Sequence, residues 1–307
     1  MPRHCALAVS AVALVTTAQL VFLHAAPAPG SALSRIRETG RLTFGYRADA
    51  RPFAYTDDAG NAAGYSIALC QKIADEAKTD LRLPALTVRW VPVMMESRFR
   101  ALQDGQVDVL CGADTVTLAR RADVAFSIPI FPGGIGALVR SDTSARLREV
   151  LEGRGQPFRP VWRAAATQLL QSRDFSVVSG TTAEPWLAQR MKELDVVAAV
   201  APVNTYGNGV QRVLDRKSDV LFGERAILLD AATRRAAGSG LVVLDRLFTY
   251  EPVALALARG DEDFRLLVDR ALSKAYRSGE IGNLYAKSFG EPGESTLTFF
   301  RQNALPE

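Results

Sequence analysis

Short apolar runs alternate with longer helical patterns along the first half of the chain. Residues 41–47, 86–93 and 107–111 are alternating or continuous apolar runs with the length of strands. Residues 66–78 and 97–105 place their apolar side chains on one side of a helix, and the second of these segments ends at a glycine. The order strand, helix, strand, helix, strand predicts an α/β lobe.

A second series of the same kind follows a glycine-containing segment. Gly133, Gly134 and Gly136 lie in strand-like surroundings, which indicates close backbone approach or a flexible crossing into a second lobe. The elements predicted from there onward are strands at 175–180, 196–200, 218–223 and 253–259 and helices at 147–155, 182–194, 208–217 and, as a pair, within 261–290. The tail 291–307 has no period and is expected to be peripheral.

The first 32 residues differ from the rest of the chain. A basic start is followed by an apolar run from Ala6 to Leu23 and then by small residues and prolines. This pattern predicts a secretory signal peptide over residues 1–32, cleaved after Ala28 or Ala32, and therefore a periplasmic location. The alternative is an uncleaved membrane anchor, because the apolar run is just long enough to span a bilayer.

Composition and charge narrow the function classes. The chain has 307 residues, enough for two domains, and a formal charge of +4, too small to indicate nucleic-acid binding. Removal of the signal peptide removes both histidines, His4 and His24, together with Cys5. Without histidine, Ser–His and Cys–His nucleophilic pairs and histidine-containing zinc sites are excluded. Two cysteines alone make a poor metal site, so we predict neither a metal nor a cofactor.

Two cysteines, Cys70 and Cys111, remain in the exported chain. Their even number in an oxidising compartment predicts a disulfide. It would close a loop of about 40 residues, which the chain-entropy treatment values at about 4 kcal/mol. The alternative is that both are reduced thiols buried in a core.

The segment CGADTVTLARRADVAFS, residues 111–127, leaves a predicted strand through hydroxyl side chains and an arginine pair. If Thr117 caps a short helix from Leu118, free N–H groups point out at the strand's end, and helix N-termini attract anions. Thr115 adds a hydroxyl, and Arg120 could grip a carboxylate through two parallel bonds. A solvated helix start with surface arginines is the alternative.

This segment resembles the periplasmic solute-binding proteins for polar amino acids, extracellular solute-binding protein family 3. Further segments follow in the order of that family: RLTFGYRADARPFAY, GNAAGYSIALCQKIA, RFRALQDGQVDVLCG, VVSGTTAE and SDVLFGERAILL. The resemblance implies the two-lobed periplasmic binding protein fold (type II), α/β in class, whose lobes are joined by two crossing strands and close on the ligand. The implied boundaries are 33–131 plus 254–307 for the first lobe, 136–250 for the second, and hinges near 132–136 and 250–254.

The resemblance also assigns the anion end of the ligand site. It implies that Arg120 holds the ligand α-carboxylate, assisted by Thr115 and by the backbone near Ala113, where relatives often have serine. Asp114 stands where relatives have an apolar residue or threonine. An acidic group would repel the ligand carboxylate, so we expect Asp114 to point away from the cleft, as strand alternation with Thr115 indicates.

The second lobe supplies the other side of the implied site. Glu224 corresponds to the acidic residue that receives the ligand α-ammonium, although most relatives have the shorter aspartate there. Thr181 and Thr182 match the GTT turn of the family, where a helix N-terminus faces the ligand. Tyr206 stands where the glutamate/aspartate-binding members have histidine.

Two further arginines indicate the ligand class. Arg47 matches the arginine that meets the ligand's side-chain carboxylate in the glutamate/aspartate-binding members, and Arg98 matches a second arginine of that subgroup. Three arginines in one cleft favour a dianionic ligand. The alternative for Arg98 is a structural ion pair with Asp104 or Glu96.

The resemblance implies a monomeric binding protein that delivers a polar amino acid, glutamate or aspartate first, to the membrane permease of an ABC-type importer. Two alternatives stay open. One is a cyclohexadienyl (prephenate/arogenate) dehydratase on the same fold, with Glu224 as general acid. The other is a receptor whose liganded form docks on a sensor kinase.

Overall fold

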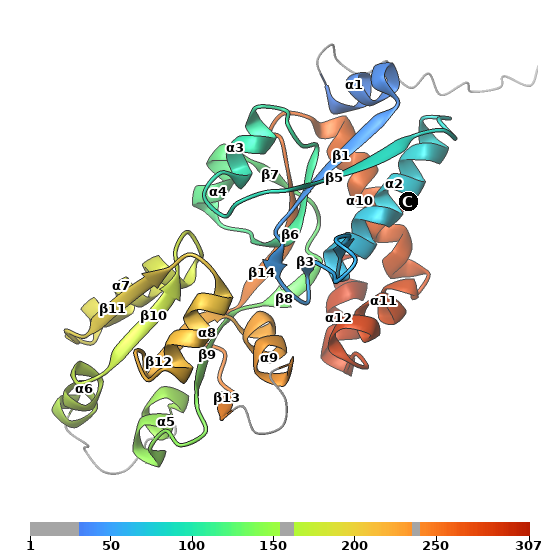
Figure 1. Cartoon of the computed structure of the whole chain (residues 1–307). Coiled ribbons are helices and arrows are strands. Elements are labelled where there is room, and N and C mark those ends of the chain that lie inside the picture. The colour runs from blue at the N-terminus through green and yellow to red at the C-terminus, as the bar shows by residue number, and fades with distance from the viewer. Residues whose placement is uncertain (1–30, 154–162, 235–239) are drawn as a thin grey trace, which may run out of the picture.

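The computed structural model describes residues 31–153, 163–234 and 240–307. They form two α/β lobes, each built on its own sheet, at opposite ends of an elongated molecule (Figure 1). The predicted fold class and its two-lobed architecture are therefore confirmed.

The sheet of the first lobe has the strand order β5-β1-β6-β14-β7, and β8 also pairs with β14. Strands β1, β5 and β6 are parallel, whereas β14 runs antiparallel to β6. The bounds of these strands are β1 Arg41–Tyr46, β5 Thr87–Pro92, β6 Val109–Thr115, β7 Ala125–Phe126, β8 Phe131–Gly133 and β14 Glu251–Leu257. A small separate sheet comprises β2 Asp49–Ala50, β3 Ala54–Thr56 and β4 Ala62–Ala63.

Helices cover the sheet of the first lobe because each buries one apolar stripe. Helix α2, for example, buries Leu69, Ile73 and Ala77 at helical spacing. The helices of this lobe are α1 Ala32–Thr39, α2 Tyr65–Asp80, α3 Arg98–Gln103, α4 Leu118–Asp123, α10 Glu262–Arg277, α11 Glu280–Phe289 and α12 Glu294–Asn303.

The sheet of the second lobe has the order β11-β10-β12-β9-β13, with β10 parallel to β11 and β12, and β9 antiparallel to β12 and β13. Its strands are β9 Ile135–Arg140, β10 Asp174–Val178, β11 Ala199–Val203, β12 Val220–Glu224 and β13 Leu241–Val243. Its helices are α5 Ala145–Glu152, α6 Arg163–Gln171, α7 Ala183–Glu193, α8 Tyr206–Leu214 and α9 Arg225–Arg234.

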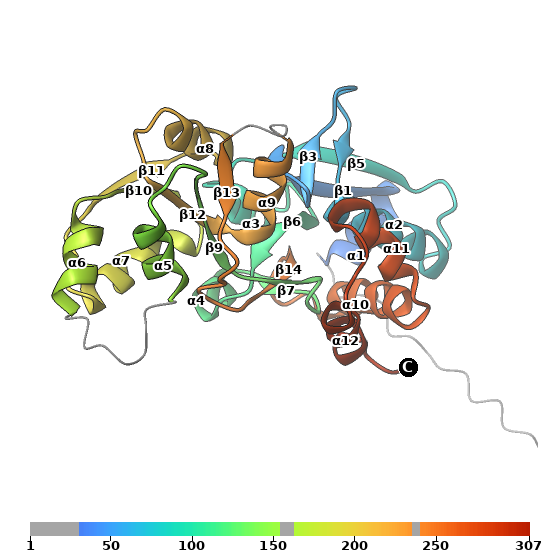
Figure 2. The same ribbon diagram turned by 90° about the horizontal axis from the view of Figure 1, so that it is seen from below.

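The chain passes between the two large sheets twice, from β8 to β9 and from β13 to β14, and these segments lie between the lobes in the second view (Figure 2). Two glycines allow the first crossing to pass close to its neighbours. A Cβ on Gly134 would lie 2.1 Å from the carbonyl oxygen of Thr249, and one on Gly133 would lie 2.7 Å from Glu224 Oε2. No side chain fits at either position, which explains the glycines noted in the sequence.

The predicted disulfide is present. Cys70 of α2 and Cys111 of β6 are bonded, with their Cα atoms 6.2 Å apart, and both are fully buried. The bond ties the helix that covers the sheet to the strand that leads into Thr115. The alternative of two free buried thiols is excluded.

Two expectations about elements were wrong, and one helix was not predicted. The tail is not only peripheral, since it forms α12, which buries Phe300 against Tyr276 with ring centroids 5.2 Å apart. The strand expected at 196–200 lies at Ala199–Val203. Helix α9 was not predicted at all, because the apolar run after Glu224 has no clear helical period.

The predicted signal peptide lies almost wholly outside the described residues, and only its last two residues can be placed. Ser31 caps α1 by accepting from the Ser34 N–H, and the Ala32 N–H donates to Asp261 at 2.6 Å. Cleavage after Ala28 would keep this helix start, whereas cleavage after Ala32 would remove it. Within the described ranges, no helix has the length and hydropathy needed to cross a bilayer.

Candidate functional site

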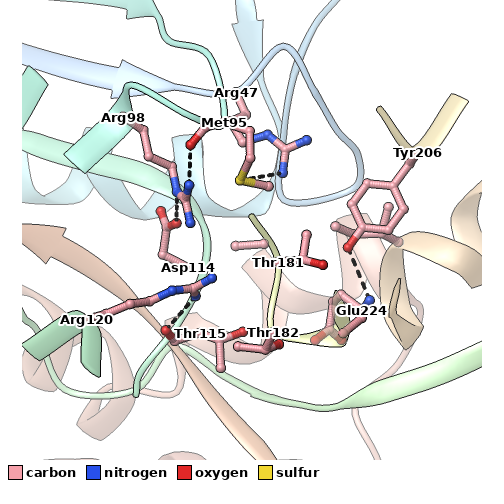
Figure 3. Close-up of a pocket in the computed structure, with 13 residues that line it drawn as sticks. Arg47, Met95, Arg98, Asp114, Thr115, Arg120, Thr181, Thr182, Tyr206 and Glu224 are labelled. Atoms are coloured by element: carbon pink, nitrogen blue, oxygen red, sulfur yellow. Dashed lines mark hydrogen bonds and ion pairs between the residues drawn. The ribbon is translucent and has the colours of Figure 1, made fainter. Parts of the chain in front are cut away.

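All nine predicted ligand-site residues line one pocket between the lobes (Figure 3). The pocket is tight, with a volume of about 20 Å³. The nine are Arg47, Arg98, Ala113, Thr115, Arg120, Thr181, Thr182, Tyr206 and Glu224. The structure thus brings all nine residues together, and their role in ligand binding stays a prediction, while the contacts described next differ from several expectations.

Arg120 reaches the pocket from the short helix after β6. Thr117 caps α4 by accepting from the Arg120 N–H at 3.1 Å, as predicted. The guanidinium turns back and donates to the carbonyl oxygens of Thr115 at 2.9 Å and of Gly180, in the other lobe, at 3.1 Å. No carboxylate of the described residues forms an ion pair with it, so its positive charge is not neutralised by direct contact, although the charges of Asp114 and Glu251 lie near enough to act on it. Burial lowers its pKa, but an arginine stays protonated.

Arg98 and Asp114 form a buried ion pair, and this corrects two expectations. Arg98 Nε donates to Asp114 Oδ1 at 2.7 Å, and both side chains are almost inaccessible to solvent. Asp114 therefore does not point away: it lines the pocket and is neutralised there. The structural partner considered for Arg98 was Asp104 or Glu96, but Asp104 pairs with Arg100 instead.

Arg47 is also paired. Its Nε and Nη2 hold the carboxylate of Asp49 through bonds of 2.7–3.0 Å, a partner that the sequence interpretation missed. The partner of the remaining nitrogen, Nη1, among the described residues is the sulfur of Met95 at 3.8 Å, a weak acceptor. The guanidinium carbon also lies 5.9 Å from the ring centroid of Tyr206 in the other lobe. Arg47 thus keeps one free end toward the pocket.

Glu224 is the acidic group at the opposite side of the pocket. Its Oε2 accepts from the Gly134 N–H at 3.1 Å and its Oε1 from the Ala226 N–H at 3.3 Å. The Glu224 N–H donates to the hydroxyl of Tyr206 at 3.1 Å. Burial raises the pKa of Glu224 to about 7, more than those N–H bonds lower it, and the charge of Glu251 adds to the rise.

The two threonines at the start of α7 already use their hydroxyl protons. Thr181 Oγ1 donates to the carbonyl oxygen of Val178, and Thr182 Oγ1 donates to Glu251 Oε2, both at 2.6 Å. In this arrangement a ligand carboxylate would meet the backbone N–H groups at the helix start, which have no intrahelical partner. Ala183 lines the same part of the pocket without a polar side chain, in agreement with such a backbone role.

Sequence reasoning missed residues of the pocket wall and two acidic residues, Asp49 and Glu251, that bond to wall residues from outside it. Met95 and Ile227 are apolar lining residues with no chemical signature in the sequence. Asp49 had a local signal, because it stands two positions after Arg47. Glu251 was not noticed, since it becomes relevant only when β14 brings it to Thr182. The described residues contain no cluster of histidine, cysteine or acidic side chains suited to a metal ion.

The pocket therefore has opposite charges at two ends. Arg120 offers a cation with unused N–H donors, and Glu224 offers a carboxylate that no basic side chain of the described residues pairs with directly. Such a pair is complementary to a zwitterion, with an anionic group toward Arg120 and a cationic group toward Glu224.

A profile of one protein family, the bacterial extracellular solute-binding proteins, family 3, matches residues 42–291. The match spans both sheets and every pocket residue. The chain belongs to this family.

Relatives of this solute-binding protein agree with the assignment. It is 26% identical over 287 residues to the L-glutamate/L-aspartate-binding protein of Pseudomonas aeruginosa, covering 92% of this chain and 89% of the relative. It is 25% identical over 268 residues to the glutamate/aspartate import solute-binding protein of Escherichia coli, covering 87% and 82% of the two chains.

Among solved structures, an ancestral amino acid-binding protein described as a precursor of cyclohexadienyl dehydratase matches with a TM-score of 0.68 and 25% identity. The match covers 84% of this chain and 99% of that one. Because the chain belongs to a family of solute-binding proteins and its curated relatives are binding proteins, it is a binding protein for amino acids and not an enzyme. The family is extracellular, and an extracellular location follows for this chain.

Proposed function

We propose that this solute-binding protein captures L-glutamate or L-aspartate in the cleft between its lobes and delivers it to the permease of an ABC-type importer. In this proposal the protein is a monomer that reaches the periplasm through the signal peptide of residues 1–32. The observation that carries the proposal is the Arg120 guanidinium, which forms no ion pair with the described residues, opposite Glu224 in one pocket. The relatives, which are glutamate- and aspartate-binding proteins, support the choice of ligand.

The α-amino acid group fits this charge arrangement. The ligand α-carboxylate lies against Arg120, beside Thr115, the backbone of Ala113 and the N–H groups at the start of α7. The α-ammonium lies against Glu224. Burial deprives the Glu224 carboxylate of water, and the ligand ammonium compensates for that loss. An acidic group at this position therefore favours a ligand with a cationic group.

The distal carboxylate of the ligand is assigned to the free end of Arg47. Nη1 of Arg47 has only a sulfur neighbour, and a carboxylate is a far better acceptor. Arg98 adds positive potential from behind, although its bond to Asp114 offsets much of that charge. Tyr206 closes this end of the cleft from the second lobe, where it packs over Arg47.

A neutral polar amino acid is the second candidate, and the ion pairs favour it. Asp49 and Asp114 already compensate Arg47 and Arg98, so only Arg120 remains without a carboxylate partner among the described residues. A ligand with an amide in place of the distal carboxylate would also satisfy the free N–H groups of Arg47.

The two crossing segments support a closing motion. We propose hinges near 132–136 and 250–254, between a first lobe of 33–131 plus 254–307 and a second lobe of 136–250. The change of sheet between Gly133 and Ile135 agrees with the first hinge, and the start of β14 at Glu251 agrees with the second.

The test is a thermal-shift screen of the mature protein, refolded to remove bound ligand. A ligand that binds only the folded state raises the melting temperature, because stabilisation grows as RT ln(1 + [L]/Kd). Shifts with glutamate and aspartate, and weaker ones with glutamine and asparagine, support the proposal. Equal or larger shifts with the amides select the second candidate. No shift with any amino acid rejects both, and prephenate serves as the control for the excluded enzyme class.

A further inference from the structure

A second, larger cavity lies on the other side of the hinge. This groove has a volume of about 410 Å³, within the range of small-molecule cavities. Phe131, Tyr285 and Phe289 of the first lobe line it, and Leu229 and Leu247 of the second lobe lie opposite. Except for Leu247, these lining residues come from β8, α9 and α11, and Figure 1 shows where these elements lie in the fold.

Helix α9 separates the groove from the ligand cleft. Ile227 lines the cleft and Leu229 lines the groove. Residues two positions apart in a helix point about 200° apart, so these side chains leave opposite faces of α9. Glu224, just before α9, borders both cavities and accepts the N–H of Gly134 in the crossing segment. The two cavities thus lie on opposite sides of one pivot.

The cleft is closed while the groove is wide. Across the cleft, Arg120 donates to Gly180 at 3.1 Å and the remaining space is about 20 Å³. A rigid rotation of the lobes about the crossing segments that widens the cleft must narrow a cavity on the opposite side. The groove walls would then approach each other, and any side chain between them would oppose the movement.

The two walls of the groove differ in how tightly their side chains are packed. On the first lobe, Phe131 and Phe289 have ring centroids 4.8 Å apart and Phe131 stacks on Tyr285 at 6.0 Å, so the aromatic wall is tightly packed. On the second lobe, Leu229 is 38% exposed and extends into unfilled space. The size of the side chain at position 229 can therefore be changed, and with it the filled part of the groove, without disturbing a packed wall.

We propose that the groove behind the hinge determines the affinity of the cleft, with Leu229 as an affinity-determining residue that never touches the ligand. A larger side chain there fills the groove and disfavours the open form. Since the apparent dissociation constant is the intrinsic one divided by the fraction of binding-competent protein, a shift toward the closed form lowers it by the same factor for every ligand. This inference needs an amino-acid ligand but does not depend on which one.

The test compares Leu229→Trp with two other tryptophan variants. Ser288→Trp fills the same groove from the opposite wall. Leu266→Trp, at a site on α10 that is 54% exposed and does not line the groove, is the matched control. Small-angle scattering of the ligand-free proteins is the first measurement, and calorimetric titration with L-glutamate and L-glutamine is the second. Both groove variants should be more compact than wild type and bind about 3- to 10-fold more tightly, whereas Leu266→Trp should match wild type.

The scattering result separates this inference from the ligand assignment. If neither amino acid binds, the compaction of the ligand-free groove variants still supports the inference. Unchanged scattering in both folded groove variants, or weaker binding in both, overturns it. A gain for one ligand only would also overturn it, since a shift of the open–closed equilibrium acts on all ligands alike. Ser288→Trp keeps the test decisive if Leu229→Trp fails to fold, as judged by circular dichroism.

Discussion

At the residue scale, the role of each charged side chain depends on whether the protein already neutralises it. Arg47 and Arg98 have carboxylate partners, whereas the partners of Arg120 within the described part of the chain are carbonyl oxygens. A guanidinium bonded to carbonyls keeps its net charge, so a ligand anion gains the full charge-assisted interaction there. We therefore expect Arg120 to be essential for binding any amino acid, and Arg47 and Arg98 to affect which amino acid is preferred.

Replacing Arg120 by alanine should therefore abolish measurable binding of every amino acid. A charge-assisted hydrogen bond contributes about 1.5–3 kcal/mol, and a bidentate pair more, so the expected loss exceeds about 100-fold. Calorimetric titration measures it. Arg121→Ala is the matched control, because the neighbouring arginine is exposed and outside the pocket. Equal losses in the two variants would show that Arg120 does not hold the ligand.

Replacing Arg47 by alanine should weaken acidic ligands selectively. The α-amino acid contacts of Arg120 and Glu224 remain, so glutamine should lose little. Glutamate should lose about 10-fold or more, because one charge-assisted bond disappears. The ratio of the two dissociation constants, measured by calorimetry, is the readout. An equal loss for glutamate and glutamine would contradict the assignment of Arg47 to the distal carboxylate.

Binding should weaken as the pH falls below 7, because of Glu224. Burial raises the pKa of Glu224 from 4.5 to about 7 in the empty site, so this carboxyl gains a proton as the pH falls through 7. The ligand α-ammonium requires the ionised form, and binding must then release that proton. Below pH 7 the dissociation constant should rise by up to about tenfold per pH unit until the pKa of the bound form is reached.

Titrations between pH 5.5 and 8 in buffers of different ionisation enthalpy would measure both the affinity and the proton release. Glu224→Gln should bind more weakly at pH 8 and lose the pH dependence. The raised pKa of Glu224 also fixes the direction in which the stability of the ligand-free protein changes with pH. An ionised carboxylate is less favourable in the folded state, so ligand-free stability should decline as the pH rises from about 4.5 to 7. An affinity that is flat across pH 6–8 would rule out this role for Glu224.

The sequence predicted the positions of the site residues better than their partners. Arg120 and Thr117 were found because their chemistry is local: a cap, a helix start and a basic side chain within one turn. The pairing of Arg98 with Asp114 was missed because it joins α3 to β6, and strand alternation alone directed Asp114 outward. Ion pairs between different elements depend on tertiary packing, which the hydrophobic periodicity of the sequence does not reveal.

At the element scale, the strands before the site were predicted well because buried strands leave clear apolar runs. The segment 107–111 marked β6, although the strand continues to Thr115 through the polar residues that form the site. Helices α9 and α12 were missed for a different reason. Their apolar residues are clustered in sequence, and their helical character depends on packing against the lobes, as Phe300 shows against Tyr276.

The disulfide between α2 and β6 should contribute strongly to the stability of the first lobe. It joins residues 41 positions apart, and the chain-entropy treatment values such a closure at about 4 kcal/mol. Urea unfolding of the wild type should therefore show a large loss of unfolding free energy after reduction. The Cys70→Ala, Cys111→Ala double variant should resemble the reduced protein and ignore the reductant. A reduced wild type as stable as the oxidised one would contradict the prediction.

At the scale of the whole molecule, two arginines of the first lobe contact the second lobe across the cleft. Arg120 bonds to Gly180, and Arg47 packs over Tyr206. Both contacts place a cation of the first lobe on the second lobe, and a bound amino acid would add contacts to each of them. The closed arrangement is therefore the one that a ligand stabilises, in accordance with population shift.

Ligand binding should compact the protein measurably. The ligand-free protein should scatter X-rays as a mixture that includes an open form, because few bonds of the described residues hold the cleft shut. Saturating ligand should reduce the radius of gyration to that calculated for the closed arrangement. Arg120→Ala should fail to compact at the same ligand concentration, since it removes both the ligand contact and the bond to Gly180. A wild type whose scattering does not change with a tightly bound ligand would show that the lobes do not move, and the cleft would then have to admit its ligand by local side-chain motion.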